Sequence, residues 1–237
     1  MRIVLFCHSL LSDWNHSSAH FLRGIATELV SRGHALRIFE PADASRRVNL
    51  VREQGTSPIQ RFRRTYPGLS SRLYRLDKLD VHEAAGKADL VIVDQRSDPE
   101  LVALLGQHRG RIGRYRLLFH DTDHRNVTAP GEMSRYDLRN YDGVLASGDV
   151  VRELYLQQGW AQSAGTWHEG ADTRRFVPTG GGQVEGDVVW IGNGGNGDRS
   201  DELREFLTEP VRRLRLRASV YGVQYPSGAV EEFNRAG

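Results

Sequence analysis

The sequence is poor in cysteine and in long hydrophobic runs. Cys7 is the single cysteine among 237 residues, which excludes an intramolecular disulfide and a zinc site built only from cysteines. The apolar run after Met1 is too short for a signal peptide, and no later run approaches the length of a transmembrane helix. We therefore expect a cytoplasmic protein with no transmembrane segment.

The sequence also has little net charge and little lysine. Its 32 Lys and Arg residues against 30 Asp and Glu residues leave a formal charge of +2, whereas nucleic-acid-binding domains are usually strongly basic. This balance predicts no nucleic-acid partner. Lys78 and Lys87 are the only lysines, so arginine supplies nearly all of the positive charge. The 39% of hydrophobic residues is typical of a globular protein.

Short apolar segments alternate with helical patterns along the first three quarters of the chain. Residues 2–7 form a continuous apolar run of strand length, residues 21–30 repeat apolar side chains at helical spacing, and residues 35–39 form a second apolar run. The same alternation predicts three further strands and four helices, namely strands at 90–93, 116–119 and 143–146 and helices near 70–86, 98–108, 131–140 and 149–158. The pattern predicts an α/β fold, a Rossmann-like parallel sheet with helices on both faces. Ligands of such sheets bind beyond the carboxyl ends of the strands.

Three consecutive glycines at 180–182 mark a break in the chain, because they carry maximal backbone freedom and lack apolar periodicity. We predict a first domain over residues 1–178, a linker over 179–185, and the start of a second domain over 186–237. Within this last part we expect a strand at 187–191, a helix at 201–214 and a strand at 216–223. It is shorter than the roughly 100 to 150 residues of a typical domain, so we expect an incomplete second βαβ unit.

A glycine-rich loop follows the first predicted strand of the second domain. It matches G-x-G-x-x-G with Gly192, Asn193, Gly194, Gly195, Asn196 and Gly197. Glycines at this position allow the backbone to approach a phosphate. An NAD site would also need an acidic residue about 20 residues later, and residues 220–224 contain none. The loop therefore favours a phosphate or nucleotide contact over NAD, with a plain glycine-rich turn as the structural alternative.

The loop after the first strand is dense in polar and aromatic side chains. Asp13 or His16 can act there as a general base, and Trp14 and Asn15 can stack on or hydrogen-bond to a ligand. The alternative is a capped helix start with a buried tryptophan. Metal binding by His16 together with His20 is disfavoured, because no third ligand is evident.

Two further polar clusters are candidates for the wall of a site. His120, Asp121 and Asp123 follow the strand at 116–119, and His168 and Glu169 lie shortly before the predicted linker. The two aspartates have the D-x-D spacing that can bind a divalent cation, but the same residues can cap a turn. We predict a polar site wall and no metal site.

The stretch from Arg46 to Arg75 contains eight arginines and a single acidic residue, Glu53. Guanidinium groups suit phosphate, so this excess can receive a phosphorylated or membrane-associated acceptor. The preferred interpretation is the solvated face of one or two amphipathic helices.

Four stretches together carry a resemblance to a known family. They are MRIVLFCHSLLSDWNHSSAHFLRGIATELVSRGHALRIFEP at the start, LLFHDTDH after residue 116, TWHEGADTRRFVP from Thr166, and DVVWIGNGGNGDRSDELREFL from Asp187. In their order they resemble the GT-B glycosyltransferases, in particular the bacterial CgeB-like and family 4-like proteins. The resemblance covers nearly the whole chain.

This resemblance implies two Rossmann-like domains that face one cleft, an N-terminal acceptor domain and a C-terminal domain for the nucleotide-sugar donor. It places the loop of Gly192 to Gly197 beside the donor phosphates and the loop of Asp13 to Ser18 beside the acceptor. His168 and Glu169 then lie in the exit from the first domain, beside the cleft. Such enzymes generally need no bound metal or other cofactor. The chain would correspond to the first two thirds of such an enzyme, without the acidic residues that hold the donor's ribose and hexose.

The expected function is transfer of a sugar from a nucleotide-sugar donor to an acceptor hydroxyl on a sugar, a lipid-linked molecule or a protein. Because part of the donor domain is missing from the pattern, a non-catalytic α/β binding or interaction module derived from such an enzyme is the main alternative. An NAD-dependent oxidoreductase is a second alternative, disfavoured by the missing acid.

Overall fold

The computed structural model describes residues 1–11, 18–122, 129–178, 180–182, 186–192, 200–222 and 225, with no side chains described at 45, 46 and 200. The chain divides into two compact units, Met1–Phe176 and Val177–Gly237, which are treated separately. The predicted linker begins at residue 179, shortly after this division. Within the described residues, no helix combines the length and the apolar character needed to cross a membrane.

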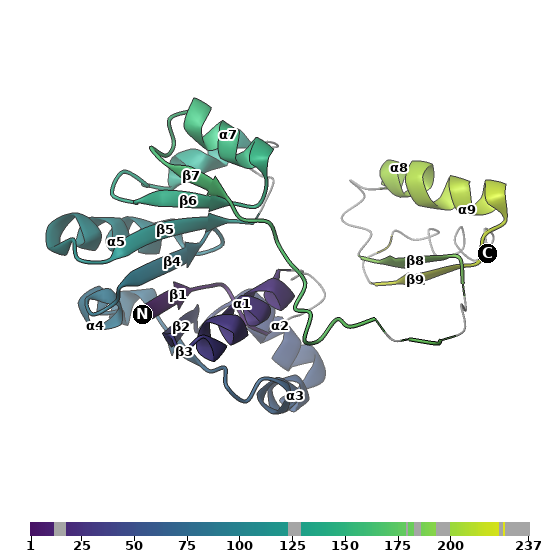
Figure 1. Ribbon diagram of the computed structural model, residues 1–237, viewed down its shortest axis with the longest axis horizontal. Helices are drawn as coiled ribbons and strands as arrows, with labels where there is room; N and C mark the ends of the chain where they lie inside the picture. Colours follow the sequence, from purple (N-terminus) through teal and green to yellow (C-terminus); the bar gives the residue numbers. More distant parts are fainter. Residues whose placement is uncertain are drawn as a thin grey trace. The chain divides into compact units, whose positions relative to one another are not determined.

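The first unit is built on a parallel sheet of seven strands in the order β3-β2-β1-β4-β5-β6-β7 (Figure 1). The strands are β1 (Arg2–Phe6), β2 (Ala35–Pro41), β3 (Ser71–Tyr74), β4 (Leu90–Asp94), β5 (Arg116–Asp121), β6 (Gly143–Ala146) and β7 (Ala164–Thr166). The strand order reverses direction between β1 and β4, so the loops after these two strands diverge at the carboxyl edge. Such a switch point is where ligands of open parallel sheets bind.

Helices cover both faces of this sheet, and β1 directs successive side chains to opposite faces. Val4 and Phe6 enter the larger core cluster, whereas Leu5 and Cys7 enter the smaller one. The helices are α1 (Ala19–Ser31), α2 (Ser45–Gln54), α3 (Ser57–Thr65), α4 (Val81–Ala85), α5 (Pro99–Ile112) and α7 (Asp149–Gln157), with the 3-10 helices η1 (Leu76–Lys78) and η2 (Pro130–Arg135). Helices α4, α5 and α7 contribute to the larger cluster, and α1 and α3 pack against the smaller one. The α/β prediction is confirmed.

Three local predictions differ from the structure. The helix predicted near 70–86 is wrong over its first part, because residues 71–74 form the edge strand β3 beside β2, with Tyr74 packed edge-on against Phe6 at 5.9 Å. Only the short η1 and α4 lie within the predicted range. The helix predicted at 131–140 is wrong beyond the short η2, since Tyr136 is extended and its ring packs 5.2 Å from Phe119. Strand β7 was not predicted, because Ala164–Thr166 contains no apolar run.

The second unit contains a smaller βαβ arrangement. Strand β8 (Val188–Ile191) pairs in parallel with β9 (Ala218–Tyr221). They are joined by consecutive helical segments, α8 (Ser200–Leu203), the π-helix η3 (Arg204–Thr208) and α9 (Glu209–Leu214). Leu203, Leu207 and Val211 lie on one side of these helices and form the described core of this unit.

Candidate functional site

Buried polar side chains gather at the carboxyl edge of the sheet in the first unit. Parallel strands deliver their terminal residues to one edge, and here those residues are enclosed by the following loops. The buried polar residues at or just beyond the ends of β1, β2, β4 and β5 are Ser9, Glu40, Asp94, Gln95, Ser97, His120 and Asp121. So many enclosed polar groups at one edge are typical of a binding site.

Glu40 and Ser9 connect the ends of β2 and β1. The Ser9 hydroxyl donates to Glu40 Oε2 at 3.1 Å, and both side chains are fully buried. The sequence analysis did not select either residue. The sequence did contain a signal for Glu40, because it directly follows the apolar Ile38 and Phe39. A carboxylate buried at the end of such a strand needs a hydrogen-bond partner.

Arg96 links the switch point to the start of α1. Its backbone N–H donates to Asp94 Oδ1 at 2.7 Å, and its guanidinium donates to the Ser18 hydroxyl at 2.8 Å. Burial raises the pKa of the Glu169 carboxyl, an effect that Arg96 opposes and Asp94 reinforces. Asp94, Arg96 and Glu169 therefore form one electrostatic neighbourhood, although β4 and the segment after β7 are far apart in sequence.

His120 is a neutral imidazole inside this edge. It is 1% exposed, and its ring lies 5.0 Å from Trp167 and 5.7 Å from Phe21. Burial, with a smaller effect from Arg96, lowers the pKa of His120 to about 4. Its Nε2, the Oε1 of Gln95 and the hydroxyl of Thr122 are buried without a hydrogen-bond partner. Buried polar atoms left in this state favour a bound polar group or water at the site.

Asp121 and His168 are held by neighbouring elements. Asp121 Oδ2 accepts a 2.7 Å hydrogen bond from the Tyr155 hydroxyl of α7, and both residues are fully buried. Burial and the nearby Asp121 raise the pKa of Tyr155 well above its ordinary value, so the phenol remains the donor. The exposed His168 donates from Nδ1 to the Ser147 carbonyl at 3.0 Å. Asp121 thus fixes α7 at the end of β5.

A cavity of about 1010 Å³ opens beside this edge, between η2 and the loops after β2, β3 and β4. Its size is at the upper end of ordinary ligand cavities. The charged side chains that line it are Asp43, Asp77, Asp98, Glu100 and Glu132 with Arg75, Arg96 and Arg135. Gln95, one of the residues with an unpartnered buried oxygen, also lines it. Carboxylates outnumber guanidinium groups, so the cavity suits a hydroxyl-rich or amine-bearing group better than a phosphate.

Several predicted site residues lie outside the described part of the chain, namely Asp13, Trp14, Asn15, His16, Asp123, Asn193, Gly194, Gly195, Asn196 and Gly197. Gly192 is described: its N–H donates to the Tyr221 carbonyl at 2.9 Å, and its own carbonyl accepts from the Tyr225 hydroxyl at 3.0 Å. Among the described residues, no group of three or more His, Cys, Asp or Glu side chains is placed to hold a metal ion.

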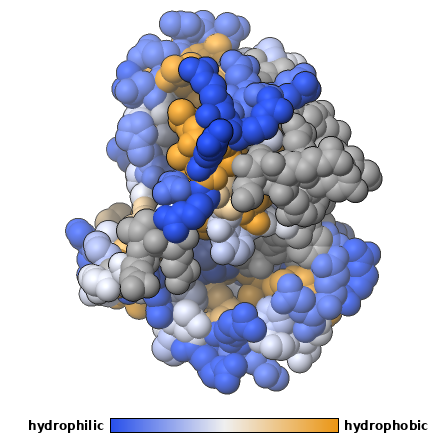
Figure 2. Space-filling model, turned by 90° about the vertical axis from the view of Figure 1, so that its right-hand side faces the viewer, coloured by the Kyte–Doolittle hydropathy of each residue, from blue (hydrophilic) through white to orange (hydrophobic). Residues whose placement is uncertain are grey.

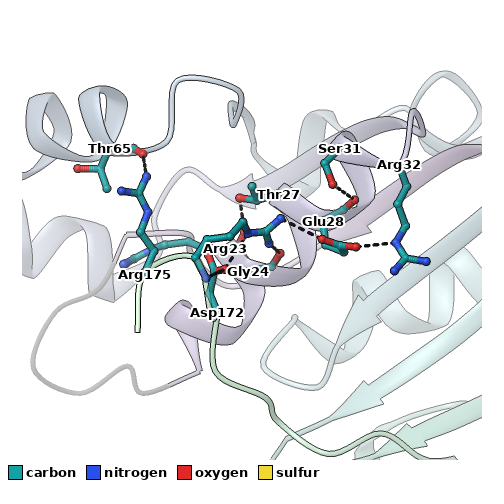
Figure 3. Close-up of polar contacts among 10 residues, drawn as sticks. Arg23, Gly24, Thr27, Glu28, Ser31, Arg32, Thr65, Asp172 and Arg175 are labelled. Atoms are coloured by element: carbon teal, nitrogen blue, oxygen red, sulfur yellow. Dashed lines mark hydrogen bonds and ion pairs between the residues drawn. The ribbon is translucent and has the colours of Figure 1, made fainter. Parts of the chain in front are cut away.

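The segment after β7, residues 167–176, is tied to α1 and α3 by a polar network (Figure 3). Arg174 donates to Asp172 Oδ1 at 2.8 Å, to Glu28 Oε2 at 2.9 Å and to the Gly24 carbonyl at 3.0 Å. Arg175 donates to the Thr65 carbonyl at the end of α3. A Cβ on Gly24 would lie 3.1 Å from Asp172 Cβ, so glycine permits this close approach. We call residues 167–176 the exit segment.

Comparison with protein-family models gives no match, and comparison with curated proteins gives none either. Among solved structures, the chain is similar to an alpha-glucosyltransferase in complex with UDP and a 13-mer DNA containing an HMU base. The identity is 13% and the TM-score 0.53, over 98% of this chain and 69% of the other. An alpha-glucosyltransferase with UDP-glucose and DNA containing an abasic site has 13% identity and a TM-score of 0.56, over 98% and 70%.

A third structure, an alpha-glucosyltransferase with UDP and a 13-mer DNA containing a central A:G mismatch, has 14% identity and a TM-score of 0.57, over 99% of this chain and 59% of the other. The chain thus spans between 59% and 70% of the length of these neighbours. At such identities the likeness concerns the fold alone, which this chain shares with these alpha-glucosyltransferases.

The prediction of no nucleic-acid partner is wrong, because these structural neighbours are all complexed with DNA. The error came from using the net charge of the whole chain. Eight arginines against one acid between Arg46 and Arg75 are offset by an excess of acidic residues elsewhere, so an almost neutral chain still contains a strongly basic region.

Proposed function

We propose that the chain is part of a GT-B glycosyltransferase that transfers a sugar from a uridine nucleotide sugar to an acceptor hydroxyl on a nucleic acid. One observation carries this proposal: the likeness to alpha-glucosyltransferases in complex with UDP or UDP-glucose and DNA extends over 98% to 99% of the chain. The likeness therefore includes both units and not only the first sheet.

In this proposal the second unit binds the donor. Gly192 directly follows β8, and the glycine-rich sequence up to Gly197 lies between that strand and the next helical segment in chain order. Glycine residues allow backbone N–H groups to approach a diphosphate closely. The same loop would stabilise the negative charge that develops on the leaving nucleoside diphosphate.

The first unit would bind the acceptor at the carboxyl edge of its sheet. The acidic cavity beside β4 favours a neutral, hydroxyl-bearing group, because carboxylates accept hydrogen bonds from hydroxyls and repel phosphates. His120 Nε2 is unpartnered, and the low pKa keeps the imidazole neutral. This supports a role for His120 in hydrogen bonding to the acceptor or its bound water.

The reaction would be attack of the acceptor oxygen on the anomeric carbon, with the nucleoside diphosphate as leaving group. A general base removes the hydroxyl proton as the new bond forms. We propose Asp13 or His16 for this role, since both follow β1 in the sequence and β1 ends at the switch point of the sheet.

Calorimetric titration of the full chain with UDP and UDP-glucose tests the donor site. We expect both to bind with a dissociation constant below about 1 mM, and Gly194→Val to weaken binding by blocking the approach to the diphosphate. Gly182→Val is the matched control, because Gly182 has nothing near its Cβ position.

Absence of UDP binding would contradict the proposal. Enhanced NADH fluorescence on mixing would favour the oxidoreductase instead. If UDP-glucose binds but is neither hydrolysed nor used with any nucleic acid, the non-catalytic binding module is favoured.

A further inference from the structure

We propose that an arginine surface on α2, α3 and β3 binds the phosphate backbone of the nucleic acid that carries the acceptor. This inference rests on the proposed function and assigns its partner to particular residues. The arginine surface is defined here by Arg52, Arg61, Arg63, Arg64 and Arg72. All five side chains are exposed, and α2 and α3 are consecutive helices that lie next to each other in Figure 1.

The first support is the charge of this part of the chain. Residues 45–75 contain eight arginines, one glutamate and no lysine, histidine or aspartate. Phosphate contacts by Lys and Arg supply most of the sequence-independent affinity for nucleic acid, and the planar guanidinium donates two parallel hydrogen bonds to phosphate oxygens. The surface thus has the charge and the donors that a phosphate backbone requires.

The second support is that most of these arginines have no acidic neighbour. Within the described residues, the side chains of Arg61, Arg63, Arg64 and Arg72 take part in no hydrogen bond or ion pair. The Arg52 guanidinium donates to Asn49 Oδ1 at 3.3 Å and approaches Glu53 Oε1 to 4.0 Å. Exposed arginines elsewhere are commonly paired, as in Arg2 with Asp89 and Arg212 with Glu209. Unpaired guanidinium groups exchange water and counterions for phosphate without first breaking an ion pair.

The third support is that one side of α3 is anchored to the rest of the first unit, so the opposite side is exposed. The guanidinium of Arg23 lies 5.8 Å from the Phe62 ring and 5.6 Å from the Tyr66 ring, and its Nε donates to the Leu10 carbonyl at 2.6 Å. Arg175 stacks on Tyr66 at 5.0 Å. The buried Arg23 and the exposed Arg175 thus hold the aromatic side of α3, which leaves its outer arginines free of any packing role.

The same arrangement argues against a membrane as the partner. A helix that lies in a membrane surface needs an apolar face to insert among the lipids. The large apolar residue Phe62 instead packs, partly buried, against the smaller core cluster. Figure 2 shows one face of the protein, on which hydrophilic residues surround smaller hydrophobic patches. Among the large apolar residues of α2, α3 and β3 whose side chains are described, only Val48 and Leu73 are exposed. The five exposed arginines therefore dominate this surface, which fits a polyanion better than a membrane.

Chain connectivity links the arginine surface to the acidic cavity. The loop Pro41–Ala44 lines the cavity and leads directly into α2, and β3 leads from Arg72 to Tyr74 and Arg75, which line the cavity again. Phosphates are repelled by the carboxylates of the cavity and attracted by the arginine surface. A polymer bound at the surface would therefore present a neutral, hydroxyl-bearing group to the cavity.

The test measures binding of a fluorescein-labelled DNA duplex to the full chain by fluorescence anisotropy at several salt concentrations. We expect the triple variant Arg61→Gln/Arg63→Gln/Arg64→Gln to bind DNA about tenfold or more weakly than the wild type. The slope of log Kd against the logarithm of the salt concentration should be smaller by about 2 to 3. The matched control is Arg111→Gln/Arg114→Gln/Arg213→Gln, which replaces three other exposed arginines without described partners. Both variants change the formal charge from +2 to −1. Thermal unfolding verifies that both are folded.

An equal loss of DNA binding in both variants, or no loss in the first, would overturn the proposal, as would binding to phosphatidylserine vesicles without binding to DNA. Titration with UDP distinguishes a failure of the arginine-surface proposal from a failure of the proposed glycosyltransferase function. UDP binding without DNA binding would overturn the arginine surface alone. DNA binding that needs Arg61, Arg63 and Arg64, without UDP binding, would support the surface and contradict the glycosyltransferase.

Discussion

At the scale of single residues, the ends of the strands show what sequence can and cannot reveal. The position of His120 and Asp121 at the carboxyl edge follows directly from the apolar run before them. The partner of Asp121 does not, because Tyr155 is 34 residues away and reaches it only after α7 has packed on the sheet. Glu40 was missed because the short second run was assigned to residues 35–39, one residue before it. Local patterns locate a site's edge, whereas long-range packing decides which groups are free there.

Burial of His120 makes the protein less stable in acid. The pKa of His120 is about 4 in the folded protein and about 6.5 in an unfolded chain. The unfolded state therefore takes up the proton first, and stability falls as the pH drops from about 6.5 to about 4. The difference corresponds to about 3 kcal/mol. We expect His120→Phe, which keeps an aromatic ring between Phe21 and Trp167, to remove this loss from the unfolding free energy.

Urea denaturation of the wild type and His120→Phe at a series of pH values measures this effect. Acidic groups shared by both proteins titrate over the same range, so the difference between the two curves is the informative quantity. Parallel curves between pH 7 and pH 4 would show that protonation of His120 does not limit stability.

At the scale of elements, the exit segment shows how an irregular stretch is held without secondary structure. Burial alone would raise the pKa of Asp172, but its hydrogen bonds with Arg174 outweigh burial and lower that pKa. Arg174 thereby joins one buried carboxylate, one exposed carboxylate and a helix carbonyl.

Arg174→Ala should destabilise the first unit by about 1 to 2 kcal/mol, since a buried carboxylate loses its charged donor. Arg32→Ala is the control. It also breaks an ion pair with Glu28, but that pair is exposed and should contribute less than about 0.5 kcal/mol. Thermal unfolding of both variants makes the comparison, and equal destabilisation would mean that the bond to Asp172 is no stronger than a surface pair.

Elements were predicted well where burial on both faces produces a continuous apolar run, as in β1, β4 and β5. The edge strands β3 and β7 were not predicted, because an edge strand is less enclosed and pairs on one side only. Residues 71–74 contain two exposed positions, Arg72 and Leu73, so nothing in their pattern distinguishes a strand from a helix. Their pairing with β2 is settled by tertiary contacts.

At the scale of the whole molecule, the net charge of the chain gave a wrong prediction about nucleic acid, whereas the distribution of charge along the sequence is informative. A formal charge of +2 excluded a nucleic-acid partner only under the assumption that charge is evenly spread. The arginines of residues 45–75 and the carboxylates of the cavity lie in the same unit. The chain divides into two compact units after Phe176, and the linker over residues 179–185 stays a prediction that rests on the glycine run at 180–182.

The two units differ greatly in the amount of core that each contains, and this predicts different stabilities. The described core of the second unit has three buried hydrophobic residues, and Val189, Ile191 and Phe206 are more than 60% exposed. The first unit has two large clusters around a seven-stranded sheet. Local stability follows buried apolar contacts, so the amides of β8 and β9 should exchange with solvent much faster than those of β1, β4 and β5.

Hydrogen exchange followed by mass spectrometry tests this difference and, with UDP added, locates the donor site. A ligand stabilises the unit that binds it, in proportion to the logarithm of its concentration over its dissociation constant. If the donor binds at the loop after Ile191, UDP should slow exchange in β8 and β9 and leave the core strands of the first unit unchanged. Protection confined to β4 and β5 would place the nucleotide at the edge that contains His120 and would reverse the assignment of donor and acceptor between the two units.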